Sequence, residues 1–310
     1  MSLPLVVVGE SLVDIVITPD GETSEAVGGS PMNVAVGLAR LGEPTLLITE
    51  IGTDAHGRKV AEHLRSAGVD LKVSSVRADM ATSTATARLD ADNAANYDFN
   101  LTWDLRHHDL PAAAGLHVGS LGAFLRPGRD SVLDLARQAS ELEMFVSYDP
   151  NMRPAFVEDK AAAWIDVAEL SALSRLVKVS DEDLHLLRPD EPLADLAREL
   201  LAAEETELVI VTCGGEASLA FTEGFDVSVP NPRVKVLDTV GAGDSFMAAT
   251  LAILSEWGLL AVGAGQLAAL DEDRVRTILG GAMVAAAVTC SRRGANPPTR
   301  PELSPTWPAS

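Results

Sequence analysis

Short runs of β-branched and other apolar residues alternate along this chain with longer stretches rich in Ala and Leu. Strands separated by helices in this way pair in parallel, so the pattern predicts an α/β fold. We expect a doubly wound, mostly parallel sheet flanked by helices, in a single domain spanning residues 1–310. The expected strands are Leu5 to Val8, Leu46 to Ile51, Gly115 to Val118, Met144 to Tyr148, Leu176 to Val179, Leu208 to Thr212 and Leu219 to Thr222. The expected helices are Met32 to Leu41, Gly57 to Ala67, Arg129 to Ala139, Ala161 to Leu173, Ala194 to Ala203, Ala242 to Leu254 and Glu272 to Val288.

Two segments instead alternate apolar and polar residues, which is typical of a sheet with one face in water. The first is Leu12 to Thr18, and the second, Ser83 to Leu101, reads as two strands around the turn Asp90 to Asn96. A sheet wet on one face cannot form the doubly wound core. We therefore expect a small antiparallel lid built from about residues 11–28 and 80–104, of the kind that covers active sites. An ordinary edge hairpin fits the same periodicity.

Composition and charge exclude several classes of partner. The 310 residues include 24 Lys and Arg against 45 Asp and Glu, a formal net charge of −21. Nucleic-acid binding depends on Lys and Arg at the phosphate backbone, so neither nucleic acid nor an anionic membrane is an expected partner. Apolar runs are interrupted well before the ~20 residues of a membrane span.

The expected compartment is the cytoplasm. The first basic residue is Arg40, so the N-terminus lacks the charged region of a secretory leader. Cys213 and Cys290 are the only cysteines, and they lie far apart in the sequence. This pattern fits a reducing compartment better than a disulfide framework.

The clearest local motif runs through residues 236–254, where a short extended stretch meets Gly241, Ala242 and Gly243 before an apolar helix. Small residues let the backbone approach a ligand, and the free N–H groups of a helix start bind anions without a basic side chain. Asp244 follows directly. It could act as a general base toward a hydroxyl that attacks a phosphoryl group, or simply cap the helix. The motif is neither a Walker A loop nor a dinucleotide-binding fingerprint.

A second motif lies near the N-terminus. Gly28 and Gly29 precede a helix whose first turn contains Asn33, and Asp14 stands in the strand-like segment upstream. Paired glycines allow the hydroxyls of a polyol to reach the backbone, and an Asn or Asp side chain can bind them. A plain turn with a local role for Asn33 is the alternative.

These two motifs, in this order, resemble those of the ribokinase-like family of carbohydrate kinases, and most closely of its bacterial fructokinases. The family carries a Gly-Gly element followed by Asn, matched by Gly28, Gly29 and Asn33, and a D-T-x-G-A-G-D element, matched from Asp238 to Asp244. The resemblance implies the ribokinase-like fold and phosphorylation of a sugar hydroxyl by ATP. By the same resemblance, Asp244 is the catalytic base, and the sugar is held by Asp14, Gly28, Gly29 and Asn33.

The resemblance also implies how phosphate and nucleotide are bound. Gly241, Ala242 and Gly243 would form the anion hole for the transferring phosphoryl group. The expected nucleotide-binding residues are Ser180, Thr212, Gly214 and Gly243. Relatives carry Asn-x-x-Glu where this chain has Ser180 and Asp183, so Asp183 is a candidate for the Mg²⁺ shell, although it is one methylene shorter. Alternatively, Asp183 is an ordinary residue of the first turn of a helix.

A monovalent cation site is implied beside the anion hole. In the family an aspartate equivalent to Asp238 contributes, together with backbone carbonyls, here expected at Val240, Thr289, Arg292 and Gly294. Such oxygen ligands suit K⁺. Some relatives add a serine where this chain has Pro298, so one ligand is missing and a requirement for K⁺ is not certain from the sequence.

The identity of the sugar depends on residues outside these motifs. Asn151 and Arg153 follow a core strand in a segment that resembles the D-P-N-x-R element of fructokinases. They would bind sugar, or Arg153 would neutralise phosphate charge; a surface arginine is the alternative. On the second lid segment, Tyr97 and Phe99 share a face that could cover the sugar or pair with the lid of a second subunit in a homodimer.

These features together predict an ATP- and Mg²⁺-dependent kinase that converts fructose to fructose 6-phosphate. A 2-keto-3-deoxygluconate kinase is the main alternative, with Arg153 or Arg88 binding the substrate carboxylate. Another sugar or nucleoside kinase is also open. A regulator built on an inactive kinase fold is disfavoured because Asp244 and the anion-hole residues are retained. A nicotinamide-dependent oxidoreductase is disfavoured because residues 9–11 carry no glycine fingerprint.

Overall fold

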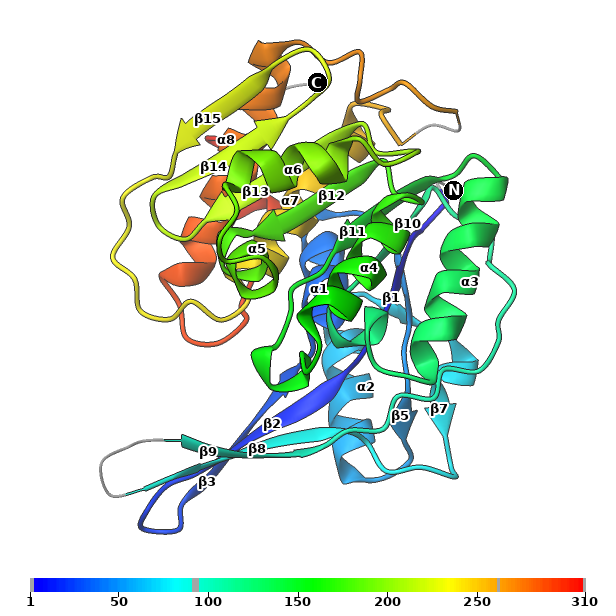
Figure 1. Cartoon of the computed structure of the whole chain (residues 1–310). Helices are drawn as coiled ribbons and strands as arrows, with labels where there is room; N and C mark the ends of the chain where they lie inside the picture. The colour runs from blue at the N-terminus through cyan, green and yellow to red at the C-terminus, as the bar shows by residue number, and fades with distance from the viewer. Residues whose placement is uncertain (1–2, 91–94, 261–262, 309–310) are drawn as a thin grey trace.

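The computed structural model describes residues 3–90, 95–260 and 263–308 (Figure 1). Within these residues nine strands form one main sheet, most of them parallel, which confirms the expected fold class. In spatial order they are β15 (Asp226–Pro230), β14 (Ala217–Phe221), β13 (Leu208–Cys213), β12 (Leu176–Ser180), β11 (Phe145–Asp149), β10 (Gly115–Gly119), β1 (Leu5–Val8), β4 (Thr45–Ile48) and β6 (Asp70–Leu71). No helix among the described residues is long and apolar enough to span a membrane.

Helices cover both faces of the main sheet because its strands are apolar on both sides. In β1, Leu5 and Val7 pack into one hydrophobic layer, and Val6 and Val8 into the other. The first layer is covered by α1 (Ser30–Leu41), α2 (Ala55–Ala67), α7 (Ala242–Glu256), α8 (Glu272–Cys290) and the short α9 (Arg300–Leu303). The second is covered by α3 (Gly128–Glu141), α4 (Lys160–Ser171), α5 (Asp181–Leu187) and α6 (Leu193–Leu201), which stand in front of the sheet in Figure 1.

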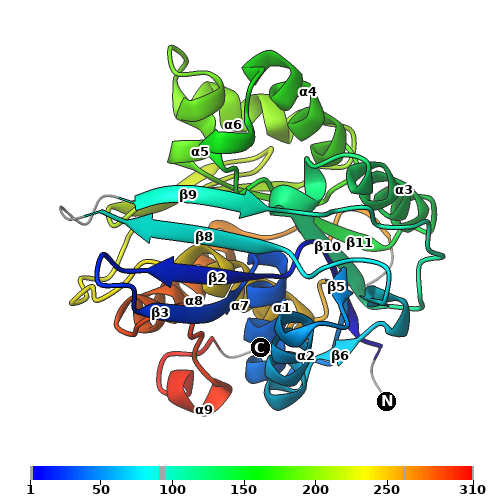
Figure 2. The ribbon, with the colours of Figure 1, turned by 90° about the horizontal axis from the view of Figure 1, so that it is seen from below.

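Four further strands form a small sheet that projects from the body of the molecule (Figures 1 and 2). Their order is β3 (Thr23–Gly28), β2 (Leu12–Ile17), β8 (Thr84–Leu89) and β9 (Ala95–Asn100). The expectation of an all-antiparallel arrangement was wrong, because β2 pairs with β8 in parallel. The chain passes through α1, β4 and α2 between these two strands, and such a crossover brings the second strand in with the same direction. Residues 91–94 of the expected turn lie outside the described residues.

Other differences from the expected elements fall at sheet edges and in short segments. The strand expected over Leu46 to Ile51 is divided into β4 and β5 (Ile51–Gly52), and β5 pairs with β7 (Val76–Arg77). The short α5 was not expected. It is nucleated by a reciprocal cap in which Ser180 and Asp183 each accept a hydrogen bond from the other's backbone N–H. Single-turn 3₁₀ helices cover Val73–Ser75, Ser120–Ala123 and Pro154–Phe156.

Candidate active site

A cavity of about 670 Å³ opens where the carboxyl ends of the parallel strands meet the start of α7 and the inner face of the small sheet. This is the edge of an open α/β sheet at which ligands bind. It gathers residues far apart in the chain, because β1, β11, β12 and β13 all end there. The expected site residues that line it are Asp14, Gly28, Gly29, Asn33, Phe99, Asn151, Arg153, Ser180, Asp183, Thr212, Gly214, Val240, Gly241, Ala242, Gly243, Asp244 and Gly294.

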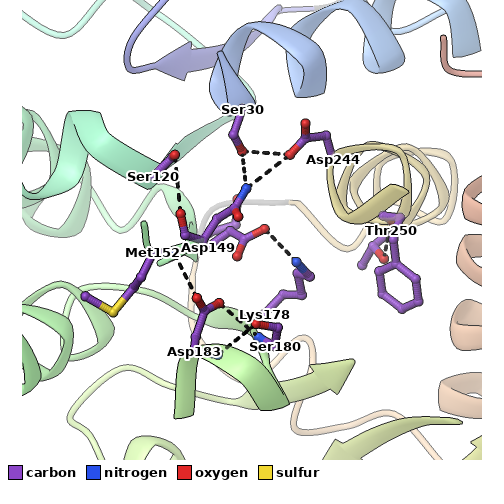
Figure 3. A network of polar contacts seen from close by, with 12 residues as sticks. Ser30, Ser120, Asp149, Met152, Lys178, Ser180, Asp183, Asp244 and Thr250 are labelled. Carbon is purple, nitrogen blue, oxygen red and sulfur yellow. Dashed lines mark hydrogen bonds and ion pairs between the residues drawn. The ribbon is translucent and has the colours of Figure 1, made fainter. Parts of the chain in front are cut away.

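Asp244 lies buried in the first turn of α7, at the wall of the cavity. Ser30 Oγ donates to its Oδ1 at 2.7 Å, and Asn33 Nδ2 donates to its Oδ2 at 2.8 Å. Figure 3 shows Asp244 facing Ser30 across the site. Burial raises the pKa of Asp244 above the usual aspartate value, while the hydrogen bonds from Ser30 and Asn33 act in the opposite direction. Its side chain forms no cap of α7, so the capping alternative is not what this structure contains.

The turn before Asp244 requires small residues. Gly241 has a φ of 76°, a left-handed conformation, and a Cβ there would lie 2.7 Å from the Cβ of Ala295. Gly243 faces the cavity, where the nearest atom to its missing side chain is the Nζ of Lys178. Ala242 N–H donates to the carbonyl oxygen of Thr239 at 3.2 Å, so the next N–H of α7, that of Gly243, is the first left without an intrahelical partner and can bind an anion.

The residues of the N-terminal motif that are suited to bind a polyol lie together on the other side of the cavity. Asp14 is on β2, opposite Ala26 of β3, and its side chain reaches Gly28 at the end of β3, where a Cβ would lie 2.3 Å from its Oδ2. Gly29 has a φ of 116°, and a Cβ there would meet the carbonyl oxygen of Glu10 at 2.5 Å. A side chain at either position would collide with neighbouring atoms, so both residues must be glycine. Their small size leaves room for the Asp14 carboxylate to face the cavity.

Asn151 is linked to Asp244 through Ser30. Its Nδ2 donates to Ser30 Oγ at 2.7 Å, and its backbone has a φ of 37°, which is uncommon for a residue other than glycine. Arg153 donates from Nη1 to Asn151 Oδ1 at 2.7 Å and lines the cavity. Arg153 is exposed and its Nη1 also donates to the carbonyl oxygens of Asn151 at 3.0 Å and Met152 at 3.1 Å, so it has the strand-capping contacts of the alternative interpretation as well as a place in the cavity lining. Its guanidinium holds Asn151 and can also reach a bound ligand.

Arg88 does not face the cavity. In the small sheet, Asp14 stands opposite Ala85 and Arg88 stands opposite Ile17. Side chains alternate between the two faces of a sheet, so Arg88 lies on the face away from Asp14 and Ala85. The suggestion that Arg88 binds a substrate carboxylate was wrong for this reason, and Arg153 remains as the candidate for that role.

The two aromatic side chains of β9 differ in position. Phe99 lines the cavity and contacts Phe156 edge to face, with ring centroids 5.0 Å apart. Tyr97 stacks on Phe99 at 5.8 Å but is 60% exposed, and it is not among the described residues that line the cavity. Phe99 can therefore contact a ligand directly, and Tyr97 can do so only through Phe99.

Three of the residues expected to bind the nucleotide lie at the ends of β12 and β13. Ser180 is the last residue of β12, Thr212 lies near the end of β13 and Gly214 follows β13, and all three line the cavity. Asp183 accepts hydrogen bonds from the N–H of Met152 at 2.8 Å and of Ser180 at 3.3 Å. Asp183 thus has the structural role of the alternative interpretation, and its carboxylate still faces the cavity with unused lone pairs.

The expected cation residues surround the loop before α7. Asp238 accepts hydrogen bonds from the N–H of Val240 at 3.1 Å and of Gly294 at 2.8 Å, which ties this loop to the segment after α8. Among the described residues lining the cavity, Asp238, Thr289 and Arg292 are not present. Thr289 is buried beneath the site and donates to Ser245 Oγ at 2.7 Å. A cation bound by backbone carbonyls here stays a prediction.

Two buried charged residues of the cavity, in addition to the more exposed Asp181 and Glu182, were not anticipated as site residues. Lys178, in the buried strand β12, pairs with Asp149 at 2.8 Å (Figure 3). Burial raises the pKa of Asp149 to about 6. Burial lowers the pKa of Lys178, but the surrounding carboxylates, led by Asp149, act in the opposite direction, and its pKa is raised on balance. The sequence contains a signal for Lys178, because it interrupts the apolar run LVKV where a buried strand excludes charge.

Glu10 is the second unanticipated buried charged residue of the cavity. It follows β1 directly, is buried, and accepts a hydrogen bond from Gly122 N–H at 2.8 Å. Burial raises its pKa to about 7, against the lowering effect of its backbone hydrogen bonds. Its signal in the sequence is an acid immediately after a buried strand.

Glu10→Gln should change the pH dependence of stability. A carboxyl whose pKa is raised by folding stabilises the fold at low pH, and this contribution is lost as the pH rises from about 4.5 to about 7. We expect the variant to gain up to about 3 kcal/mol in unfolding free energy relative to the parent at pH 8, and far less at pH 5. Urea unfolding of both proteins at the two pH values measures this gain. Parallel pH profiles would contradict it.

The whole cavity is strongly acidic. Its described lining includes six carboxylates, from Glu10, Asp14, Asp181, Glu182, Asp183 and Asp244, and two basic side chains, from Arg153 and Lys178. A polyphosphate ligand would therefore need to bind together with a cation that offsets the repulsion between its phosphates and these carboxylates. The described residues contain no group of three or more His, Cys, Asp or Glu residues able to hold a metal by themselves.

Comparison with known proteins gives consistent results. The model of the pfkB family of carbohydrate kinases matches residues 3–302. A fructokinase of Rhizobium leguminosarum bv. trifolii is 34% identical over 279 residues, which cover 86% of this chain and 84% of that protein. A double mutant of Vibrio cholerae fructokinase, solved with fructose, ADP and potassium ion, aligns with a TM-score of 0.81 at 25% identity over 99% of both chains. Aminoimidazole riboside kinase of Salmonella enterica, with its riboside and an ATP analogue, aligns with a TM-score of 0.80 at 25% identity over 98% of this chain and 99% of that one.

Proposed function

Because the chain belongs to the pfkB family of carbohydrate kinases, we propose that it transfers the γ-phosphoryl group of ATP to the primary hydroxyl of fructose, giving fructose 6-phosphate and ADP. The observation that carries the proposal is the position of Asp244. Its carboxylate is buried, hydrogen-bonded by Ser30 and Asn33, and placed in the cavity between the polyol-type residues and the start of α7.

Asp244 supplies the base for this reaction. The hydroxyl oxygen of the sugar attacks the γ-phosphorus and its proton passes to the Asp244 carboxylate, while the bond from phosphorus to the β-γ bridging oxygen breaks and ADP leaves. Ser30 and Asn33 fix the carboxylate so that an oxygen is presented to the hydroxyl. The raised pKa of Asp244 brings it closer to that of an efficient base at neutral pH.

The backbone at the start of α7 stabilises the transferring group. The N–H group of Gly243 is at the positive end of the helix and Gly243 lines the cavity, so it can bind a phosphoryl oxygen as charge develops, whereas Ala242 N–H is held by the carbonyl oxygen of Thr239 at 3.2 Å. Asp183, with Ser180 beside it, is suited to bind Mg²⁺ through water, as hard oxygen donors at the same wall of the cavity. When bound, Mg²⁺ neutralises the charge of the β- and γ-phosphates.

Two observations favour fructose as the acceptor: the names of related proteins and the polar groups of the cavity. The Rhizobium relative is named a fructokinase, and the Vibrio protein binds fructose. In this chain Asp14, Asn33 and Asn151 offer hydrogen-bonding groups to a polyol, and a site built on such bonds rejects analogues that leave them unpaired. The phenyl ring of Phe99 covers the same side of the cavity.

A steady-state comparison of substrates tests the proposal. Release of ADP is followed with fructose, ribose, adenosine, aminoimidazole riboside and 2-keto-3-deoxygluconate, each with ATP and Mg²⁺, with and without K⁺. We expect the highest kcat/KM with fructose. Preference for the keto acid would assign Arg153 to a substrate carboxylate, preference for a riboside would overturn the assignment to fructose, and no turnover at all would favour a binding protein. Stimulation by K⁺ would support the cation site at Asp238.

We expect the small sheet to act as the lid of this active site. Its strands contribute Asp14, Ala85 and Phe99 to the cavity, and closure over the sugar would exclude water that would otherwise hydrolyse ATP. The pairing of two such sheets in a homodimer stays a separate prediction, which sedimentation of the parent protein would test.

Phe99→Ala should raise the KM for fructose more than the KM for ATP. The substitution removes the ring that lines the sugar side and contacts Phe156, and burial of such a ring is worth roughly 2 kcal/mol. We therefore expect about a 30-fold rise in KM for fructose. Tyr97→Ala is the matched control, because Tyr97 is on the same strand and mostly exposed. Equal effects on both KM values would remove Phe99 from the sugar site.

A further inference from the structure

Lys178 occupies an unfavourable position for a charged residue. Its side chain is 4% exposed and lies on the face of β12 that it shares with Leu176, in the layer covered by α7. Transfer of an ammonium group from water to such an interior costs several kcal/mol, even when it is paired. The ion pair with Asp149 recovers part of this cost, and it leaves Asp149 Oδ1 buried without a hydrogen-bond partner among the described residues.

The neighbouring helix start makes the position of this charge more unfavourable still. A Cβ built on Gly243 would lie 3.1 Å from Lys178 Nζ, so the ammonium stands directly beside the first turn of α7. The N-terminal end of a helix carries partial positive charge and is stabilised by anions, not cations. Both groups face the cavity, and an anion bound between them would be attracted by both.

Hydrogen-bonding capacity supports the same interpretation. An ammonium has three N–H donors, and among the described residues the structure gives Lys178 one acceptor, Asp149 Oδ2. The remaining N–H donors can find an acceptor in the cavity, because Lys178 is part of the cavity lining. Asp149 fixes the ammonium from behind (Figure 3). A phosphoryl group at the start of α7 would satisfy these donors.

We propose that Lys178 binds the γ-phosphoryl group of the nucleoside triphosphate during its transfer, and that Asp149 is a positioning residue for the ammonium. The proposal rests on the kinase activity proposed above. The acceptor oxygen forms the new bond to phosphorus, the bond to the β-γ bridging oxygen breaks with its electron pair leaving on ADP, and the acceptor proton goes to Asp244. Lys178 gives up no proton in this step; it neutralises charge on the equatorial phosphoryl oxygens.

The test compares Lys178→Met with the double variant Asp149→Asn/Lys178→Met. The single variant leaves Asp149 as an uncompensated buried charge and could unfold for that reason. The double variant removes both charges together and keeps similar side-chain volumes, so it is expected to fold. Lys160→Met is the matched control, since Lys160 is exposed at the start of α4, outside the cavity lining. Each protein is assayed for kcat, for KM of both substrates, for ADP affinity by calorimetry and for thermal unfolding.

If Lys178 acts on the transferring group, the double variant should lose about 10²–10³-fold in kcat, the effect of removing one preorganised donor. Its ADP affinity should stay within about threefold of the parent, because ADP lacks the γ-phosphate. If Lys178 only neutralises Asp149, the double variant should instead recover kcat to within about tenfold of the parent, which would overturn the proposal. Parallel loss of kcat and ADP affinity would overturn it as well. Turnover by the parent protein tests the kinase activity separately.

Discussion

Asp244→Asn is expected to reduce kcat by about 10²–10⁴-fold, the usual contribution of a general base. The amide keeps the shape of the carboxylate and can still accept from Ser30, but it cannot take a proton from the sugar hydroxyl. ADP affinity should persist, because the backbone of α7 is unchanged. Steady-state kinetics and ADP calorimetry measure the two effects.

Asp54→Asn is the matched control for this variant. Asp54 caps α2 by accepting from Gly57 N–H at 2.8 Å, and it lies outside the described cavity lining. The Asp54→Asn variant should lose some stability, because one amide oxygen cannot replace both carboxylate oxygens that accept from Gly57 N–H and Thr82 N–H, and it should keep its kcat. If Asp244→Asn behaved like Asp54→Asn, with normal turnover and lower stability, the general-base assignment would be wrong.

Gly241→Ala is expected to impair both folding and catalysis. A left-handed conformation costs a residue other than glycine roughly 1–2 kcal/mol, and the new Cβ would also overlap Ala295, with 2.7 Å to its Cβ. Relief of this contact must displace the start of α7, which carries the Gly243 N–H group that can bind the phosphoryl group. We expect a fall in kcat of about 10²-fold, comparable to loss of one anion-hole donor.

Gly68→Ala separates the two effects. Gly68 ends α2 with a φ of 83°, and nothing lies within 4 Å of its missing Cβ. This control should lose roughly 1–2 kcal/mol of unfolding free energy through conformation alone and retain kcat. Chemical denaturation and steady-state kinetics on both variants give the comparison. Near-normal turnover by Gly241→Ala would mean that the start of α7 does not bind the transferring group.

Hydrophobic periodicity located the strands of the main sheet other than its two edge strands, and its helices other than the short α5 and α9, because buried strands and amphipathic helices leave strong local patterns. It failed at the small sheet, where the parallel pairing of β2 with β8 depends on the route of the chain between them. It also missed β15, a short edge strand (Asp226–Pro230) with alternate exposed residues. Edges and pairing directions are set by tertiary contacts that a local window does not contain.

The expected site residues came mainly from a family resemblance, and the structure brings most of them to one cavity. Their catalytic and binding roles stay predictions. The pattern did not identify the partners of Asp244, because Ser30 and Asp244 are 214 residues apart and meet only through the packing of α1 against α7. Nor did it exclude Arg88, whose direction depends on strand register. Contacts between distant elements decide both points.

The two hairpins of the small sheet are not interchangeable in a chimaera. The β2–β3 hairpin ends at Gly28 and leads directly into α1, which holds Asp244 through Ser30 and Asn33, so replacing this hairpin would also disturb the base. The β8–β9 hairpin contributes Ala85 and Phe99 to the cavity from a separate part of the chain. Exchange of that hairpin between related kinases could therefore alter acceptor preference while the phosphoryl-transfer residues stay in place. The fold thus places Phe99, one of the groups proposed to contact the acceptor, on a segment separate in the chain from the residues that hold Asp244, whereas Asp14 and Asn33 are tied to that part.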